Sequence, residues 1–136
     1  MILSISDIKK FRKEIEKLVF TYLLVTIACA ILGAVYESFS HGVYSYYMLY
    51  AFMIPLLGGT LPFSCVLYFR NKIPRPMARR FHHFGISTLT VGSIFCGVLE
   101  IYGTTNRLVI LYFILGGMFL FLGNLLYLLQ KNSRVY

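Results

Sequence analysis

The chain contains no tryptophan, only three cysteines and only five acidic residues. The cysteines are far apart, so the sequence has neither a C-x-x-C redox motif nor a disulfide framework. We expect Cys29, Cys65 and Cys96 to behave as small apolar side chains. Long polar stretches are also lacking, since the longest covers residues 1–17. We therefore expect no separate soluble catalytic domain.

Four apolar runs make up most of the chain and cover residues 18–36, 46–69, 81–102 and 108–129. A helix of roughly 20 apolar residues crosses the ~30 Å hydrocarbon core of a bilayer. The sequence therefore predicts an all-α integral membrane protein, a single membrane domain of residues 1–136 with a four-transmembrane-helix bundle. No Asp, Glu, Lys or Arg lies deep within a run, which argues against an ion-coupled pump or proton relay.

The basic residues predict the orientation of the chain. Twelve of the 13 Lys and Arg residues lie before the first run, between the second and third, or after the fourth. Only Arg107 lies on the opposite side. Because short loops rich in Lys and Arg stay in the cytoplasm, we expect both termini to be cytoplasmic. The expected location is a bacterial cytoplasmic (plasma) membrane.

The same basic residues identify lipid as the expected partner. They are divided among three segments beside the membrane instead of forming one basic face, so we exclude nucleic acid. Anionic lipid head groups are expected to contact Arg75, Arg79 and Arg80. Residues 1–17 carry apolar side chains such as Ile8 and Phe11 at three- and four-residue steps. This segment predicts an interfacial amphipathic helix on the inner leaflet.

Short connections at 37–45 and 103–107 predict that the four runs form two hairpins. The two hairpins have similar features in similar places, which are a glutamate at the end of the first helix and a glycine pair within the second: Glu37, Glu100, Gly58-Gly59 and Gly116-Gly117. One explanation is a parallel duplication of a single hairpin. Chance is the other, because short motif matches are often accidental.

The second run is the least regular, because Pro55, Gly58, Gly59 and Pro62 lie around its midpoint. Proline removes a backbone hydrogen bond and glycine permits non-helical dihedral angles. Within a membrane, the freed carbonyl groups must find donors in neighbouring helices, hydroxyl groups or water. The run is either a transport element or an ordinary kink, and we favour the kink.

Small residues in the third and fourth runs predict close helix packing at Ser93, Gly97, Gly116 and Gly117. Such packing serves either one bundle or a contact between protomers. The third run has the most small and hydroxylated side chains, so we expect it to be the central helix.

The outer rim carries a candidate polar site made of Glu37, His41, Glu100 and Arg107. Both glutamates end the first helix of a hairpin, and Arg107 follows a tight turn from which it would bridge them. The alternative is a hydrated salt bridge that fixes the loops, because surface ion pairs are common and weak.

Metal and cofactor sites are not expected. His82 and His83 begin the third run at the inner rim, whereas His41 lies in the outer loop, so the three cannot share one haem. Adjacent helical residues point about 100° apart, and no spaced set of metal ligands accompanies them.

Three functions are compatible with these features. The first hypothesis is a non-enzymatic multi-pass membrane protein that acts through helix packing, as a homo-oligomer or as an accessory subunit of a larger membrane complex. The second is a small-solute or lipid transporter that uses Pro55, Gly58, Gly59 and Pro62. The third is a membrane enzyme that acts on a lipid head group.

Overall fold

The computed structural model describes residues 4–69 and 74–130, and every regular element in these ranges is helical. The elements in chain order are α1 (Ile5–Phe39), α2 (Tyr46–Leu49), α3 (Met53–Pro55), the π-helical segment η1 (Leu56–Thr60), α4 (Leu61–Phe69), α5 (Pro76–Ile101), the 3-10 turn η2 (Arg107–Val109) and α6 (Ile110–Leu129). The prediction of an all-α protein is confirmed for these residues.

Three helical stretches are long and apolar enough to cross a membrane: Ile5–Phe39, Pro76–Ile101 and Arg107–Leu129. The apolar stretch Met53–Phe69 is shorter, because the second run is interrupted near its outer end. At a rise of 1.5 Å per residue, 17 helical residues cover about 25 Å. The three long stretches indicate a membrane protein.

Residues 5–17 differ from the expected separate interfacial helix, because they form the first turns of α1 without a break. Ser4 caps this helix by accepting a hydrogen bond from the backbone N–H of Asp7 at 3.3 Å. Neither glycine nor proline occurs between residues 5 and 32, so nothing local interrupts the helix. Ile15, which belongs to the apolar stripe, is fully buried inside the protein.

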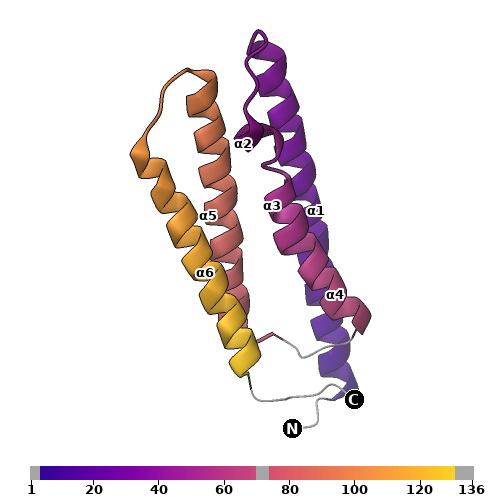
Figure 1. Cartoon of the computed structure of the whole chain (residues 1–136). Coiled ribbons are helices and arrows are strands. Elements are labelled where there is room, and N and C mark those ends of the chain that lie inside the picture. Colours follow the sequence, from indigo (N-terminus) through magenta and orange to yellow (C-terminus); the bar gives the residue numbers. More distant parts are fainter. Residues whose placement is uncertain (1–3, 70–73, 131–136) are drawn as a thin grey trace.

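The helices form two side-by-side groups (Figure 1). In one group α1 packs against α3, η1 and α4, and in the other α5 packs against α6 along its length. Helix α5 also contacts α2, α3 and η1, so it joins the groups. The start of α5 and the end of α6 lie at one end of the molecule, which we call the basic end because it carries Arg75, Arg79 and Arg80.

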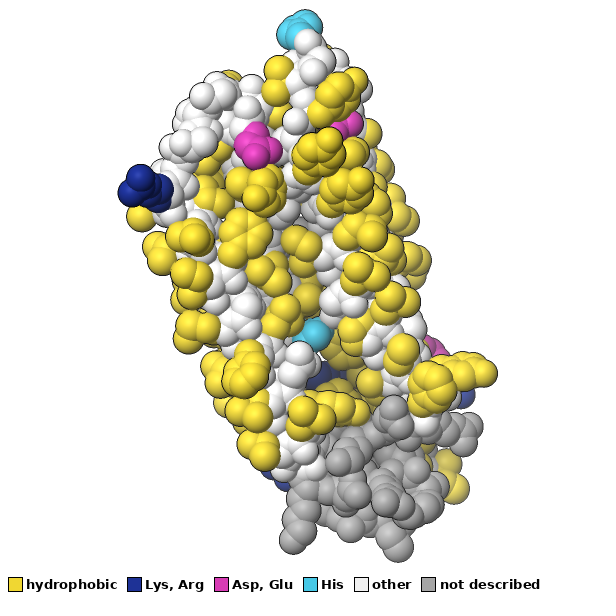
Figure 2. Space-filling model, in the orientation of Figure 1, with side chains coloured by type: hydrophobic (Ala, Val, Ile, Leu, Met, Phe, Trp, Pro, Cys, Tyr) yellow, Lys and Arg dark blue, Asp and Glu magenta, His cyan; other side chains and the backbone are white. Residues whose placement is uncertain are grey.

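Apolar side chains cover most of the face shown in Figure 2, from one end of the helices to the other. The charged side chains visible there gather toward the two ends. Inside, Ile15, Tyr22, Phe63 and Ile86 form a buried cluster contributed by α1, α4 and α5. This distribution matches a protein whose outer surface meets hydrocarbon and whose core lies between the helix groups.

Glycines bring α5 and α6 close together. A Cβ atom on Gly116 would lie 2.6 Å from Leu89 Cγ, and one on Gly123 would lie 2.9 Å from the backbone nitrogen of His82. Gly97 meets Met48 in the same way, and the Ser93 hydroxyl donates to the Tyr47 carbonyl at 2.7 Å.

The other glycine of the second pair, Gly117, has nothing within 4 Å of its Cβ position and faces outward. The two glycine pairs also differ in local structure. Gly58 and Gly59 lie in the π-helical segment, whereas Gly116 and Gly117 lie in the regular helix α6.

Candidate functional site

The second apolar run contains the most irregular backbone among the described residues. Pro55 has no N–H, and the Ala51 carbonyl four residues earlier accepts instead from the N–H of Ile54 at 3.3 Å. Further along, the N–H of Leu61 bonds to the carbonyl of Leu56, five residues back, which defines a π-helical turn. Such turns often occur at functional sites.

Pro62 deprives Gly58 of its usual hydrogen-bond donor. In an α-helix the carbonyl of residue 58 would accept from the N–H of residue 62, and proline has none. Helix α5 supplies the missing donor, because Nε2 of His82 lies 2.5 Å from the Gly58 oxygen. The carbonyl can only accept, so Nε2 carries the proton. One hydrogen bond thus joins the two helix groups where the backbone is irregular.

The neighbouring histidine makes a second polar contact between the groups. His83 Nδ1 and the Tyr22 hydroxyl are hydrogen-bonded, which links α5 to α1. The ring of Phe63 stacks on both, with centroids 5.8 Å from Tyr22 and 5.6 Å from His83. Gly59 makes room for this cluster, since a Cβ there would lie 2.2 Å from the Tyr22 ring. The two histidines therefore point to different partners.

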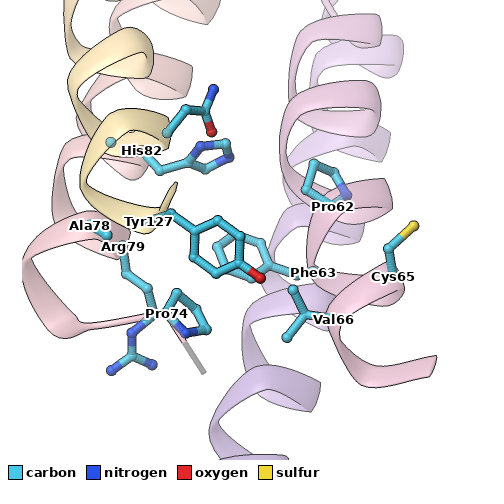
Figure 3. Close-up of a pocket in the computed structure, with 11 residues that line it drawn as sticks. Pro62, Phe63, Cys65, Val66, Pro74, Ala78, Arg79, His82 and Tyr127 are labelled. Atoms are coloured by element: carbon cyan, nitrogen blue, oxygen red, sulfur yellow. The ribbon is translucent and has the colours of Figure 1, made fainter. Parts of the chain in front are cut away.

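A cavity of about 250 Å³ opens beside these contacts, between α4 and the α5–α6 pair. Figure 3 shows Tyr127 reaching from α6 toward Phe63, with His82 above it and Arg79 below it. Most of the wall is apolar, and the polar side chains in it are Arg79, His82, Asn124 and Tyr127. The site combines a polar lower edge with an apolar interior.

The arginines expected to meet lipid head groups lie at the basic end. Arg75 is the N-cap residue of α5 and Arg80 is exposed on its first turns. Arg79 lines the cavity, and its Nη1 lies 3.4 Å from Oε2 of Glu14 on α1. The structure thus gives the three arginines different surroundings.

The polar residues expected at the outer rim are not joined into one site. Glu100 accepts a hydrogen bond from the Ser45 hydroxyl at 2.5 Å, which ties α5 to the start of α2. Among the described residues, no ion pair connects Arg107 to Glu37 or Glu100. His41 lies in the exposed loop with a left-handed backbone, at φ 51°. The structure therefore does not show the expected bridge by Arg107.

The sequence predicts that His82 and His83 lie at the inner rim, but it does not predict their hydrogen-bond partners. The signal for the first contact was the spacing of Gly58 and Pro62, which predicts a carbonyl without a donor. The sequence does not say which helix supplies the donor. Within the described parts of the chain, no three His, Cys, Asp or Glu side chains gather as metal ligands.

Comparisons with known protein families, with curated proteins and with solved structures found no match.

Proposed function

We propose that this chain is a four-segment membrane bundle of two hairpins, with both termini in the cytoplasm, that acts through helix packing. It works as a homo-oligomer or as an accessory subunit of a larger membrane complex. The observation that carries this proposal is the outward face of α6. Large side chains there remain exposed, among them Ile114 at 51%, Met118 at 55% and Phe121 at 67%.

Gly117 lies open among these side chains and offers a place for close approach. Exposed apolar groups alone do not drive association in a bilayer, because lipid tails are equally apolar. Small residues do promote association, since they let two helix backbones come close and increase van der Waals contact. The notch at Gly117, flanked by Ile114 and Phe121, fits this mode of packing.

Native mass spectrometry of the full chain in a mild detergent tests the proposal. We expect several copies per particle, or a second protein that co-purifies. Gly117→Leu fills the notch and should reduce the assembled fraction about tenfold, which corresponds to ~1.4 kcal/mol. Met118→Leu changes the same face while conserving volume, so it should leave assembly intact.

Monomers alone in the wild type, with no co-purifying subunit, would contradict assembly. Equal effects of the two substitutions would place the contact elsewhere. Circular dichroism of each variant confirms that the helices have formed.

A second candidate function is the passage of a lipid or small solute along the interrupted second segment. The π-helical turn at Gly58 and the adjoining cavity favour it, because broken helices in transporters often mark substrate sites. Pro55→Ala and Gly58→Ala should then slow the movement of a fluorescent phospholipid across proteoliposomes while assembly stays intact. Unchanged movement relative to empty liposomes would exclude this candidate for phospholipids.

A further inference from the structure

The cavity at the basic end is large enough to hold only part of a ligand. Its volume of about 250 Å³ is below the roughly 300–1,000 Å³ typical of sites that enclose a whole small ligand. Its walls are mostly apolar, with Phe63 and Val66 on α4 and Ala78 on α5, so ordered water has few polar partners there. An occupant that extends beyond the cavity fits both facts.

The cavity adjoins the surface that faces the bilayer. Cys65, in its wall, is exposed, and Tyr68 and Leu128, close to the wall on α4 and α6, are among the exposed large side chains. Figure 2 shows a hollow between the two helix groups toward the lower end, with histidine and Lys or Arg side chains visible inside it. A lipid in the adjacent leaflet therefore has direct access.

Arg79 gives the lower edge of the cavity a positive charge. Its side chain is only 20% exposed, and its ion pair with Glu14 is long at 3.4 Å. A guanidinium group has five N–H donors in a planar fork that matches a phosphate group. Partial burial strengthens such an interaction, because water screens it less. Arg79 can therefore bind an anion in addition to Glu14.

We propose that this cavity binds one anionic phospholipid from the leaflet at the basic end. The lipid phosphate lies at Arg79, and the beginning of one acyl chain enters the cavity past Tyr127 and lies against Phe63 and Val66. The rest of the lipid remains in the bilayer. This proposal goes beyond a general attraction of lipid by basic residues, because it assigns one lipid to one binding site. We call this site, formed by Arg79, Tyr127, Phe63 and Val66, the seat.

The seat is next to the hydrogen bond that joins the helix groups. His82 lines the cavity and donates to the Gly58 carbonyl. A bound acyl chain excludes water from this hydrogen bond, and a hydrogen bond is electrostatically stronger in a medium of low dielectric constant. Occupancy of the seat should therefore stabilise the association of the two groups.

The test measures lipid binding by the full-length chain in mild detergent, with phosphatidylglycerol as the anionic probe and phosphatidylcholine as the zwitterionic one. Native mass spectrometry counts the lipids retained, and circular dichroism at 222 nm follows thermal unfolding, since there is no tryptophan to report it. We expect one phosphatidylglycerol per chain at low lipid concentration, bound at least tenfold more tightly than phosphatidylcholine, and a higher Tm when it is bound.

Four variants separate the seat from general surface charge. Arg79→Gln should weaken phosphatidylglycerol binding about tenfold, whereas Arg80→Gln, which removes an exposed charge one residue away, should leave it nearly unchanged. Val66→Phe fills the cavity and should lower binding while keeping every charge. Glu14→Gln removes the carboxylate that competes for Arg79 and should tighten binding several-fold.

Several results would overturn the seat. One is an equal loss in Arg79→Gln and Arg80→Gln, which would indicate diffuse attraction to the basic end. A second is equal binding of the two lipids, and a third is full competition by inorganic phosphate, which would indicate an anion site without a lipid chain. If Arg79→Gln does not fold, Val66→Phe and Glu14→Gln still decide the question. The outcome is independent of the assembly proposal, since Gly117 lies on the outward face of α6.

Discussion

His82 donates to the carbonyl of Gly58, whose usual α-helical donor position is occupied by Pro62, which has no N–H. The cost of an unsatisfied buried carbonyl is about 1–3 kcal/mol, which exceeds the net value of an ordinary hydrogen bond. The contact between His82 Nε2 and Gly58 is therefore more important for holding the helix groups together than its single hydrogen bond suggests.

Removing the donor should destabilise the protein. We expect His82→Ala to lower the free energy of unfolding by about 1–3 kcal/mol, as measured by circular dichroism during titration with a denaturing detergent. His82→Gln retains an N–H donor, so it should cost less than His82→Ala.

Pro62→Ala provides a matched background for this experiment, because it restores an N–H four residues after Gly58. In that background, the loss of unfolding free energy caused by His82→Ala should be smaller by ~1 kcal/mol. If the cost of His82→Ala is the same with and without Pro62, the imidazole does not act through the Gly58 carbonyl.

At the scale of elements, α5 and α6 are held close by glycines, and at Gly123 the nearest neighbours are backbone atoms. A Cβ on Gly123 would lie 2.9 Å from the nitrogen of His82 and 3.2 Å from the carbonyl oxygen of Ala78. Backbone atoms cannot move aside as a flexible side chain can. Any larger residue at this position must push the two helices apart.

The glycines of α6 give a matched pair of substitutions. Gly123→Ala should destabilise the protein by about 1–3 kcal/mol because the α5–α6 contact is overpacked. Gly117→Ala meets nothing within 4 Å in its own chain and gains helix propensity, so under conditions that keep the chain monomeric we expect no loss of stability. Thermal unfolding of both variants in one detergent makes the comparison. Equal Tm values for the two variants would show that the helices are not packed as closely as described.

The apolar runs predicted the long helices well, because composition alone determines which segments cross a membrane. The predicted third run, 81–102, ends one residue beyond α5 but begins five residues after its start, and the fourth, 108–129, matches α6 with its preceding turn. Helical periodicity in residues 5–17 was correctly recognised. Periodicity does not distinguish a helix that lies on a membrane from one that continues into it, so the unbroken α1 was missed.

The interior contacts were harder to predict because they depend on how helices align. The turn after α2 at Tyr50 contains no glycine or proline, so local sequence gives little sign of it. The pairs His82 with Gly58 and Tyr22 with His83 depend on the axial position of α5 relative to α1 and η1. A single sequence shows which polar groups need hydrogen-bond partners, but it does not show how far one helix is shifted along another.

At the scale of the whole molecule, the helices have unequal lengths. The 35 residues of α1 correspond to about 52 Å, and the 26 residues of α5 to about 39 Å. Helix α1 is therefore longer than a hydrocarbon core of ~30 Å, and its lysines all lie within its first 13 residues. We therefore expect the basic end to project beyond the bilayer.

Cysteine labelling tests the proposed orientation. In a background without Cys29, Cys65 and Cys96, we expect His41→Cys to react with a membrane-impermeant maleimide in intact cells. Ser6→Cys should react only after the membrane is permeabilised, because short basic segments are retained in the cytoplasm. The opposite pattern would reverse the assigned orientation. Both residues are exposed, so access within the protein does not limit the reaction.

The hydrogen bond from His82 to Gly58 also has a consequence for biosynthesis. The two residues are 24 positions apart, so Gly58 emerges from the ribosome before His82 does. An unpaired carbonyl in hydrocarbon costs several kcal/mol. We therefore expect the second segment to remain beside water or the insertion machinery until α5 arrives, so that the two segments enter the lipid together.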